Sequence, residues 1–382
     1  MKSLGRILVT GILAINLAAC GWFGGEVEIE PAELVSFDSE KSVKMLWSRS
    51  IGSGADDKFN QLTLGIAEDK IFASDAEGRV VAVNRADGKE LWSVDLETTI
   101  IGGVGVGPQH VAVSTEQGEL VMLDAVTGAE KWRSQLSSEA LSPAQMNNEL
   151  VVSQLISGKL IAMDISSGEH RWTFDSQIPR LTLRGSSAPI VAANITIAGF
   201  ANGKVVAIRN DTGLQVWERL VAAPQGKTEL ERMVDIDGQP LFLNGVIYIV
   251  SYQGRLVAIN ARDAQVLWSQ ATSSYKGLAA GFGNIYVSNA GGHVQAFDQR
   301  SSASVWNQNA LELRQLTSPA VVGNTVVVGD YEGYLHFMSQ VDGHFVARYK
   351  VDSSALKGDM RVIDDTLYVL TNGGRLAALT LN

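Results

Sequence analysis

Residues 78–92 read GRVVAVNRADGKELW, and this pattern of a glycine, a short apolar run and a tryptophan fourteen residues after the glycine recurs along the chain. The copies begin at Gly78, Gly118, Gly158, Gly203, Gly254, Gly292, Gly333 and Gly374, at intervals of 38 to 51 residues. Six copies carry the tryptophan, the seventh has Ala347 in its place, and the last reaches the C-terminus first. A period of about 40–45 residues suits a unit of four short strands, so the repeat predicts an all-β array of four-stranded sheets.

Within each copy the residues have the pattern of a β-hairpin. The glycine permits the positive φ of a tight turn, and the second and fifth residues after it are large and apolar. The fourth residue after it is alanine in six copies, which suits a place where backbones or neighbouring sheets approach closely. The tryptophan on the next strand has enough area to pack between adjacent sheets.

The tryptophan missing from the last copy is found near the N-terminus, where residues 44–47 read KMLW, ahead of the first full copy. An N-terminal strand at this position would complete the last sheet and leave no open sheet edge. We therefore predict that residues 43–382 form one eight-bladed β-propeller of four-stranded blades, closed by pairing of its N- and C-terminal strands.

The N-terminus has the pattern of a bacterial lipoprotein signal. Lys2 and Arg6 precede a short apolar run at residues 7–16, and residues 17–20 read LAAC. The alternative is a transmembrane helix, but the apolar run is well short of the roughly 20 residues that a span requires. We predict a signal peptide at 1–19, acylation of Cys20, and a flexible tether over residues 20–42.

Charge and sorting signals restrict the location and the partners. Gly21 follows the cysteine, whereas lipoproteins retained in the inner membrane typically carry aspartate there, so we expect an outer-membrane protein facing the periplasm. Removal of residues 1–19 leaves 29 Lys and Arg against 41 Asp and Glu, a net charge of −12. This balance argues against nucleic acid as a partner.

Catalytic, cofactor and metal motifs are not found in the sequence. It lacks a nucleophile elbow and a His-Glu-x-x-His motif, and Cys20 is its single cysteine. The stretch Asp235-Ile-Asp237-Gly238 begins like a calcium loop but lacks the third ligand and the closing glutamate. We predict neither catalytic residues nor a bound cofactor or metal.

The two longest repeat intervals, 45 and 51 residues, are consecutive, and their extra residues follow Trp172 and Trp217. Arg184 lies five residues before Pro189, and Asp235 lies five residues before Pro240, so both insertions should emerge on the same face. Insertions on one face commonly mark a binding surface. Apolar residues beside an arginine and two carboxylates would form a protein-docking patch. The alternative is that the leucines pack into the next blade and Arg184 pairs with Asp235 or Asp237.

The lipoprotein signal, the eight repeats, the stretch LTLRGSSAP at 181–189 and the Asp-Ile-Asp before Pro240 together resemble the BamB family of outer-membrane lipoproteins. The resemblance spans the whole chain and implies a non-enzymatic scaffold of the β-barrel assembly machinery. Its implied partners are the periplasmic POTRA domains of BamA, and unfolded outer-membrane proteins remain open as further partners. The implied partner-binding residues are Leu181, Leu183, Arg184, Asp235 and Asp237. Ala347 departs from the repeat and puts in doubt only the packing of the seventh blade.

Two other classes of protein use related propellers. Quinone-dependent dehydrogenases share the repeat and hold pyrroloquinoline quinone with calcium. Their chains are longer and carry an adjacent cysteine pair, and this sequence has neither feature. A polysaccharide-binding propeller would favour clustered exposed aromatic residues, whereas the repeat tryptophans are accounted for by packing between blades.

Overall fold

The computed structural model describes residues 30–55 and 62–382 and divides the chain into two compact units, Met1–Pro31 and Ala32–Asn382. The fold below is that of the second unit. The predicted signal peptide, Cys20 and residues 21–29 of the predicted tether lie outside the described residues. No helix among the residues described has the length and hydrophobicity needed to cross a membrane.

The second unit consists of eight four-stranded antiparallel sheets, which we number as blades in chain order. Blade 1 comprises β2 (Gly65–Ala67), β3 (Lys70–Ser74), β4 (Arg79–Asn84) and β5 (Glu90–Asp95), and blade 2 comprises β6 (Gly105–Gly107), β7 (His110–Ser114), β8 (Glu119–Asp124) and β9 (Glu130–Gln135). Blade 3 comprises β10 (Gln145–Met146), β11 (Leu150–Gln154), β12 (Lys159–Asp164) and β13 (His170–Asp175), and blade 4 comprises β14 (Ile190–Val191), β15 (Ile195–Gly199), β16 (Lys204–Arg209) and β17 (Gln215–Leu220). Blade 5 comprises β18 (Leu241–Leu243), β19 (Val246–Val250), β20 (Arg255–Asn260) and β21 (Val266–Ala271), and blade 6 comprises β22 (Leu278–Gly281), β23 (Asn284–Ser288), β24 (Val294–Asp298) and β25 (Ser304–Gln308). Blade 7 comprises β26 (Ala320–Val322), β27 (Thr325–Gly329), β28 (Tyr334–Ser339) and β29 (Phe345–Lys350), and blade 8 comprises β30 (Arg361–Ile363), β31 (Thr366–Leu370), β32 (Arg375–Leu381) and β1 (Val43–Ser50).

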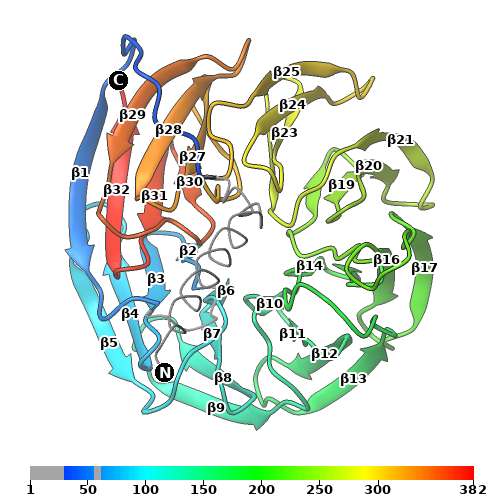
Figure 1. The fold of residues 1–382 in the computed structure, drawn as a ribbon. Helices are drawn as coiled ribbons and strands as arrows, with labels where there is room; N and C mark the ends of the chain where they lie inside the picture. The colour runs from blue at the N-terminus through cyan, green and yellow to red at the C-terminus, as the bar shows by residue number, and fades with distance from the viewer. Residues whose placement is uncertain (1–29, 56–61) are drawn as a thin grey trace, which may run out of the picture. The chain divides into compact units, whose positions relative to one another are not determined.

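The blades follow one another around a ring, with the first strand of each blade nearest the centre (Figure 1). The middle strands are almost wholly buried, as in β4, whereas outer strands such as β5 alternate between half-buried and exposed residues. This alternation is expected because only one face of an outer strand contacts the neighbouring blade. The predicted eight-bladed β-propeller is confirmed.

The ring is closed by the two ends of the chain. β1 pairs antiparallel with β32, from Val43 opposite Leu381 to Ser50 opposite Arg375. Beyond this ladder, Ser42 and Asn382 exchange two backbone hydrogen bonds. Blade 8 therefore contains the first and the last strand of the unit, as the displaced tryptophan predicts.

Seven tryptophans join neighbouring blades through the same contact. Each indole Nε1 donates a hydrogen bond of 2.7–3.3 Å to a backbone carbonyl in the turn between the third and fourth strands of the next blade. The donor and acceptor pairs are Trp47 with Arg85, Trp92 with Ala125, Trp132 with Ile165, Trp172 with Asn210, Trp217 with Ala261, Trp268 with Gln299, and Trp306 with Gln340. The indole ring also covers the backbone of this turn. At Gly88, where φ is +69°, a Cβ would lie 2.5 Å from the indole of Trp47.

The repeat alanine has a more specific role than the sequence suggests. In blade 1, Ala82 lies directly opposite Trp92 on the neighbouring strand, and the same pairing of alanine with tryptophan occurs in blades 3, 4, 5, 6 and 8. In blade 7 the sizes are exchanged, because Phe337 lies opposite Ala347. The departure at Ala347 is therefore matched by a larger partner across the strand pair.

Residues 32–42, which we call the N-terminal strap, contact blade 7. The guanidinium of Arg348 donates to the carbonyl of Val35 at 2.9 Å and lies 4.9 Å from the centre of the Phe37 ring. Phe37 stacks on Phe345 with 5.5 Å between ring centres. The amides of Glu40 and Lys41 both donate to the carbonyl of Val346. This part of the predicted tether is thus held by the blade.

Candidate partner-binding site

The two inserted connections, residues 176–189 and 221–240, lie next to one another. The Leu183 amide donates a 2.9 Å hydrogen bond to Oδ1 of Asp235, and the Ser187 hydroxyl donates a 2.9 Å bond to the carbonyl of Gly238. Gly185 approaches Asp237 so closely that a Cβ on the glycine would lie 2.3 Å from the carboxyl carbon. The sequence prediction that both insertions emerge on one face agrees with these contacts.

Asp235 and Asp237 occupy different environments. Asp235 is fully buried, with its Oδ2 unpartnered among the described residues. Burial raises the pKa of Asp235. Burial, and then the nearby Asp235 charge, raises the pKa of Asp237 to about 8, while the charge of Lys276 acts in the opposite direction. Asp237 is half-buried and lines the central cavity, and with this pKa its carboxyl group is largely protonated at neutral pH.

The remaining predicted residues are more accessible. Leu181 is 36% exposed and Leu183 is half-buried. Arg184 adopts a positive φ of 54°, and its side chain is 52% exposed. Its guanidinium forms a 2.8 Å ion pair with Glu139, which lies in the connection between blades 2 and 3. Arg184 is therefore braced from outside the two insertions, by a residue that the sequence analysis did not select.

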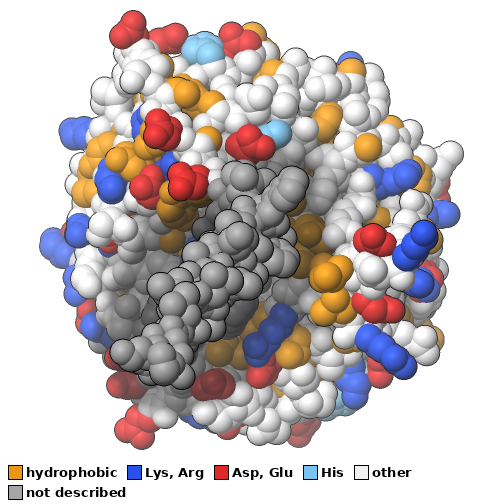
Figure 2. Space-filling model, in the orientation of Figure 1, with side chains coloured by type: hydrophobic (Ala, Val, Ile, Leu, Met, Phe, Trp, Pro, Cys, Tyr) orange, Lys and Arg blue, Asp and Glu red, His pale blue; other side chains and the backbone are white. Residues whose placement is uncertain are grey.

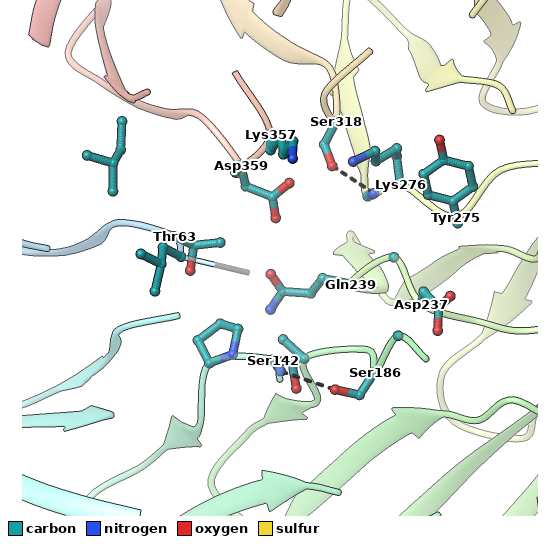
Figure 3. Close-up of a pocket in the computed structure, with 18 of the residues that line it drawn as sticks. Thr63, Ser142, Ser186, Asp237, Gln239, Tyr275, Lys276, Ser318, Lys357 and Asp359 are labelled. Carbon is teal, nitrogen blue, oxygen red and sulfur yellow. Dashed lines mark hydrogen bonds between the residues drawn. The ribbon is translucent and has the colours of Figure 1, made fainter. Parts of the chain in front are cut away.

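A cavity of about 440 Å³ opens at the centre of the ring beside these loops. Its lining includes Leu183, Arg184 and Asp237, so part of the predicted docking patch borders the cavity. Figure 3 shows Gln239, Lys276, Lys357 and Asp359 around the same space, on three connections between blades.

A sequence signal for this lining does exist, although the sequence analysis did not use it. Four connections end in a residue followed by proline, and that residue lines the cavity in each: Ser142, Ala188, Gln239 and Ser318. The restriction that proline places on the preceding residue makes these segments extended as they approach the first strand of a blade.

The charged side chains on the visible face are mixed in sign. Over the coloured part of Figure 2, acidic and basic residues are interspersed around the ring. Within residues 30–55 and 62–382, no group of three or more His, Cys, Asp or Glu is arranged to hold a metal ion.

The blades, the interblade tryptophans and the paired loops define an eight-bladed propeller that presents connecting loops beside a central cavity. A family profile described as "Outer membrane protein assembly factor BamB" matches residues 76–308 and 290–382. The outer membrane protein assembly factor BamB of Pseudomonas aeruginosa is 55% identical over 371 residues, covering 97% of this chain and 98% of that protein.

Solved structures agree with the family match. The crystal structure of BamB from Moraxella catarrhalis has a TM-score of 0.83 at 28% identity, covering 89% of this chain and 100% of the other. A quinohemoprotein alcohol dehydrogenase from Comamonas testosteroni has a TM-score of 0.68 at 12% identity, covering 88% and 76% respectively, which shows a shared fold alone. The chain belongs to the BamB family of outer membrane protein assembly factors.

Proposed function

We propose that this protein is a non-enzymatic scaffold that binds the POTRA domains of BamA and so assists the folding and insertion of outer-membrane β-barrel proteins. Membership in the BamB family supports the assembly role and the outer-membrane location. The observation that carries the proposed contact is the hydrogen bond from Leu183 to Asp235, because it joins the two inserted loops into one surface.

The five proposed residues have separate roles on this surface. Leu181 and Leu183 supply apolar area, and the exposed guanidinium of Arg184 supplies a directional donor of the kind that interface hot spots favour. Asp235 is buried beneath the loop, so it acts as a positioning residue that holds the Leu183 backbone. Asp237 packs against Gly185 from the neighbouring loop.

The contact can be tested by measuring binding of the detergent-purified protein to immobilised BamA POTRA domains. The double variant Leu181→Ala/Arg184→Ala should bind at least about tenfold more weakly, which corresponds to about 1.4 kcal/mol. The matched control is Leu214→Ala/Arg209→Ala, which removes an exposed leucine and an exposed arginine at the β16–β17 turn of blade 4. This control should bind like the wild type.

Asp235 requires a different comparison, because its effect is indirect. Asp235→Ala should weaken binding by releasing the loop, whereas Asp235→Asn keeps an oxygen acceptor for the Leu183 amide and should restore most of the affinity. Equal binding by the loop variants and the control would show that the interface with the POTRA domains lies outside these two loops. Absence of binding by the wild type would refute a direct contact with these domains.

We also propose that acylation of Cys20 anchors the protein in the membrane, with residues 20–31 as the remaining tether. The lipoprotein signal in the sequence supports this assignment. Cys20→Ser should abolish lipid labelling and move the protein out of the outer-membrane fraction. Unchanged fractionation and labelling would contradict the assignment.

A further inference from the structure

The central cavity contains cationic side chains that the assembly role does not use. Lys276 lies in the connection between blades 5 and 6, and Lys357 lies in the connection between blades 7 and 8. Both amino groups are on the same side of the cavity and are turned toward one another (Figure 3). The ring closure brings these two residues, 81 positions apart in the sequence, to one space.

Neither lysine amino group has a close acidic partner in the part of the chain that the structure describes. Among the described residues, the structure gives the Nζ atoms of Lys276 and Lys357 no ion pair within 4.0 Å and no hydrogen bond. Lys276 is half-buried, and its Nζ lies 5.2 Å from the centre of the Tyr275 ring. A partly buried charge without a partner is unfavourable, and a second like charge nearby adds to that cost.

The acidic residues in the lining do not offset these cations fully. Asp359 faces the cavity and partly balances the charge of Lys276. Asp237 is largely neutral at pH 7 because burial raises its pKa to about 8. Arg361 adds a further positive charge to the lining, and its Nε donates to the carbonyl of Leu64 at 3.4 Å. Burial lowers the pKa of Lys276, and an anion bound beside it would favour its charged form. Among the described residues of the lining, four basic side chains stand against two carboxyl groups.

The volume of the cavity and the uncharged hydrogen-bonding side chains of its lining restrict the class of ligand that it can bind. A volume of about 440 Å³ is much larger than a single inorganic ion needs and falls in the range of about 300–1,000 Å³ that is typical of small-molecule sites. The side-chain amide of Gln239 extends into the space, with the hydroxyls of Ser142, Ser186 and Ser318 around it (Figure 3). Such a lining can orient a polar organic molecule between the two lysines.

We propose that the central cavity is a binding site for a small organic anion with two or more carboxylate or phosphate groups, held by Lys276 and Lys357. The site borders the proposed BamA contact, because Leu183, Arg184 and Asp237 also line the cavity, but ligand binding by the two lysines needs no second protein. Its test therefore uses ligand affinity in the absence of BamA, and failure of one proposal leaves the other standing.

Isothermal titration calorimetry of the full chain in detergent at low ionic strength tests the site, with citrate as the carboxylate probe and inorganic pyrophosphate as the phosphate probe. Saturable binding of either probe is expected, and the preferred probe identifies the acidic group. Lys276→Gln and Lys357→Gln should each weaken binding by about tenfold or more, since a charged hydrogen bond contributes about 1.5–3 kcal/mol. Lys44→Gln, on the exposed side of β1, makes the same charge change and should leave the affinity within about twofold.

Folding and binding can be separated by two further measurements. Lys276→Arg retains the charge and should bind within about tenfold of the wild type, and thermal unfolding should show that Lys276→Gln is at least as stable as the wild type, since it removes an uncompensated charge. Absence of saturable binding by the wild type up to about 10 mM of both probes would overturn the proposal, because such affinities are weaker than about 3 kcal/mol. Equal weakening by Lys44→Gln would also overturn it, because binding would then reflect net charge.

Discussion

The contact between blades 7 and 8 differs from the other seven contacts between neighbouring blades. At those seven contacts, an indole covers the turn between the third and fourth strands of the next blade and donates to its backbone. At the contact between blades 7 and 8, Ala347 takes the place of tryptophan. Blade 8 has no such turn, because its third strand, β32, and its fourth strand, β1, are not consecutive in the chain. Hydrogen bonds between Ser42 and Asn382 extend their ladder where the turn would lie.

This difference shows what the repeated tryptophan does. The tryptophan packs on a turn of the next blade. It is absent at the contact between blades 7 and 8, where blade 8 has the Ser42–Asn382 hydrogen bonds in place of that turn. Two compensations accompany the change. Phe337 replaces the small residue of the cross-strand pair, and the strap amides of Glu40 and Lys41 occupy the carbonyl of Val346, the residue before Ala347.

The largest expected effect is at one of the tryptophan contacts. Trp172 is 5% exposed and donates a 2.7 Å hydrogen bond to Asn210 of the next blade. Trp172→Ala should lower the free energy of unfolding by about 3–5 kcal/mol, because it leaves a large cavity and an unpaired carbonyl. Urea unfolding measures this loss, with the exposed Leu214→Ala as control. A cost below about 1 kcal/mol would show that the indole contacts do not hold the blades together.

An intermediate effect is expected from introducing a tryptophan at the exceptional contact. Ala347 is buried opposite Phe337, so Ala347→Trp should destabilise the fold by about 1–3 kcal/mol through overpacking. The double variant Ala347→Trp/Phe337→Ala restores the alanine–tryptophan pair of blades 1, 3, 4, 5, 6 and 8 and should recover part of this loss in the same urea assay. Stabilisation by Ala347→Trp alone would contradict the view that the contact lacks a place for an indole.

The smallest expected effect isolates the contact between an indole and a turn glycine. Gly343 has φ of +78° and lies under Trp306, where a Cβ would be 2.6 Å from the ring, whereas Gly245 has φ of +79° with no atom within 4 Å. Alanine at either position incurs about 1–2 kcal/mol of backbone strain. Gly343→Ala should cost about 1 kcal/mol more than Gly245→Ala because the indole must shift. Equal thermal unfolding midpoints would indicate that the indole adapts freely.

The candidate site was only partly predictable from the sequence. The long repeat intervals located the two loops, and the resemblance to the family selected Leu181, Leu183, Arg184, Asp235 and Asp237. Nothing in the sequence assigned Asp235 and Asp237 different roles. In the structure, Asp235 accepts a hydrogen bond from the Leu183 amide, whereas Asp237 borders the cavity.

The residues that the sequence analysis missed come from other connections. Glu139 pairs with Arg184, while Lys276 and Lys357 point toward one another on one side of the cavity. Their proximity depends on how eight blades meet at a centre, and no spacing within one repeat encodes it. The four residues that precede prolines are the part of this lining that a sequence pattern could have revealed.

The sequence by itself determined the blades, their number and the closure of the ring, because hairpin glycines, alternating apolar residues and a displaced tryptophan act locally and recur with a fixed period. Only the tertiary structure decided why Ala347 is tolerated, which aspartate supports the loop and which cations remain unpaired. Burial and electrostatic pairing depend on distances between residues far apart in the chain, and closing the ring sets those distances.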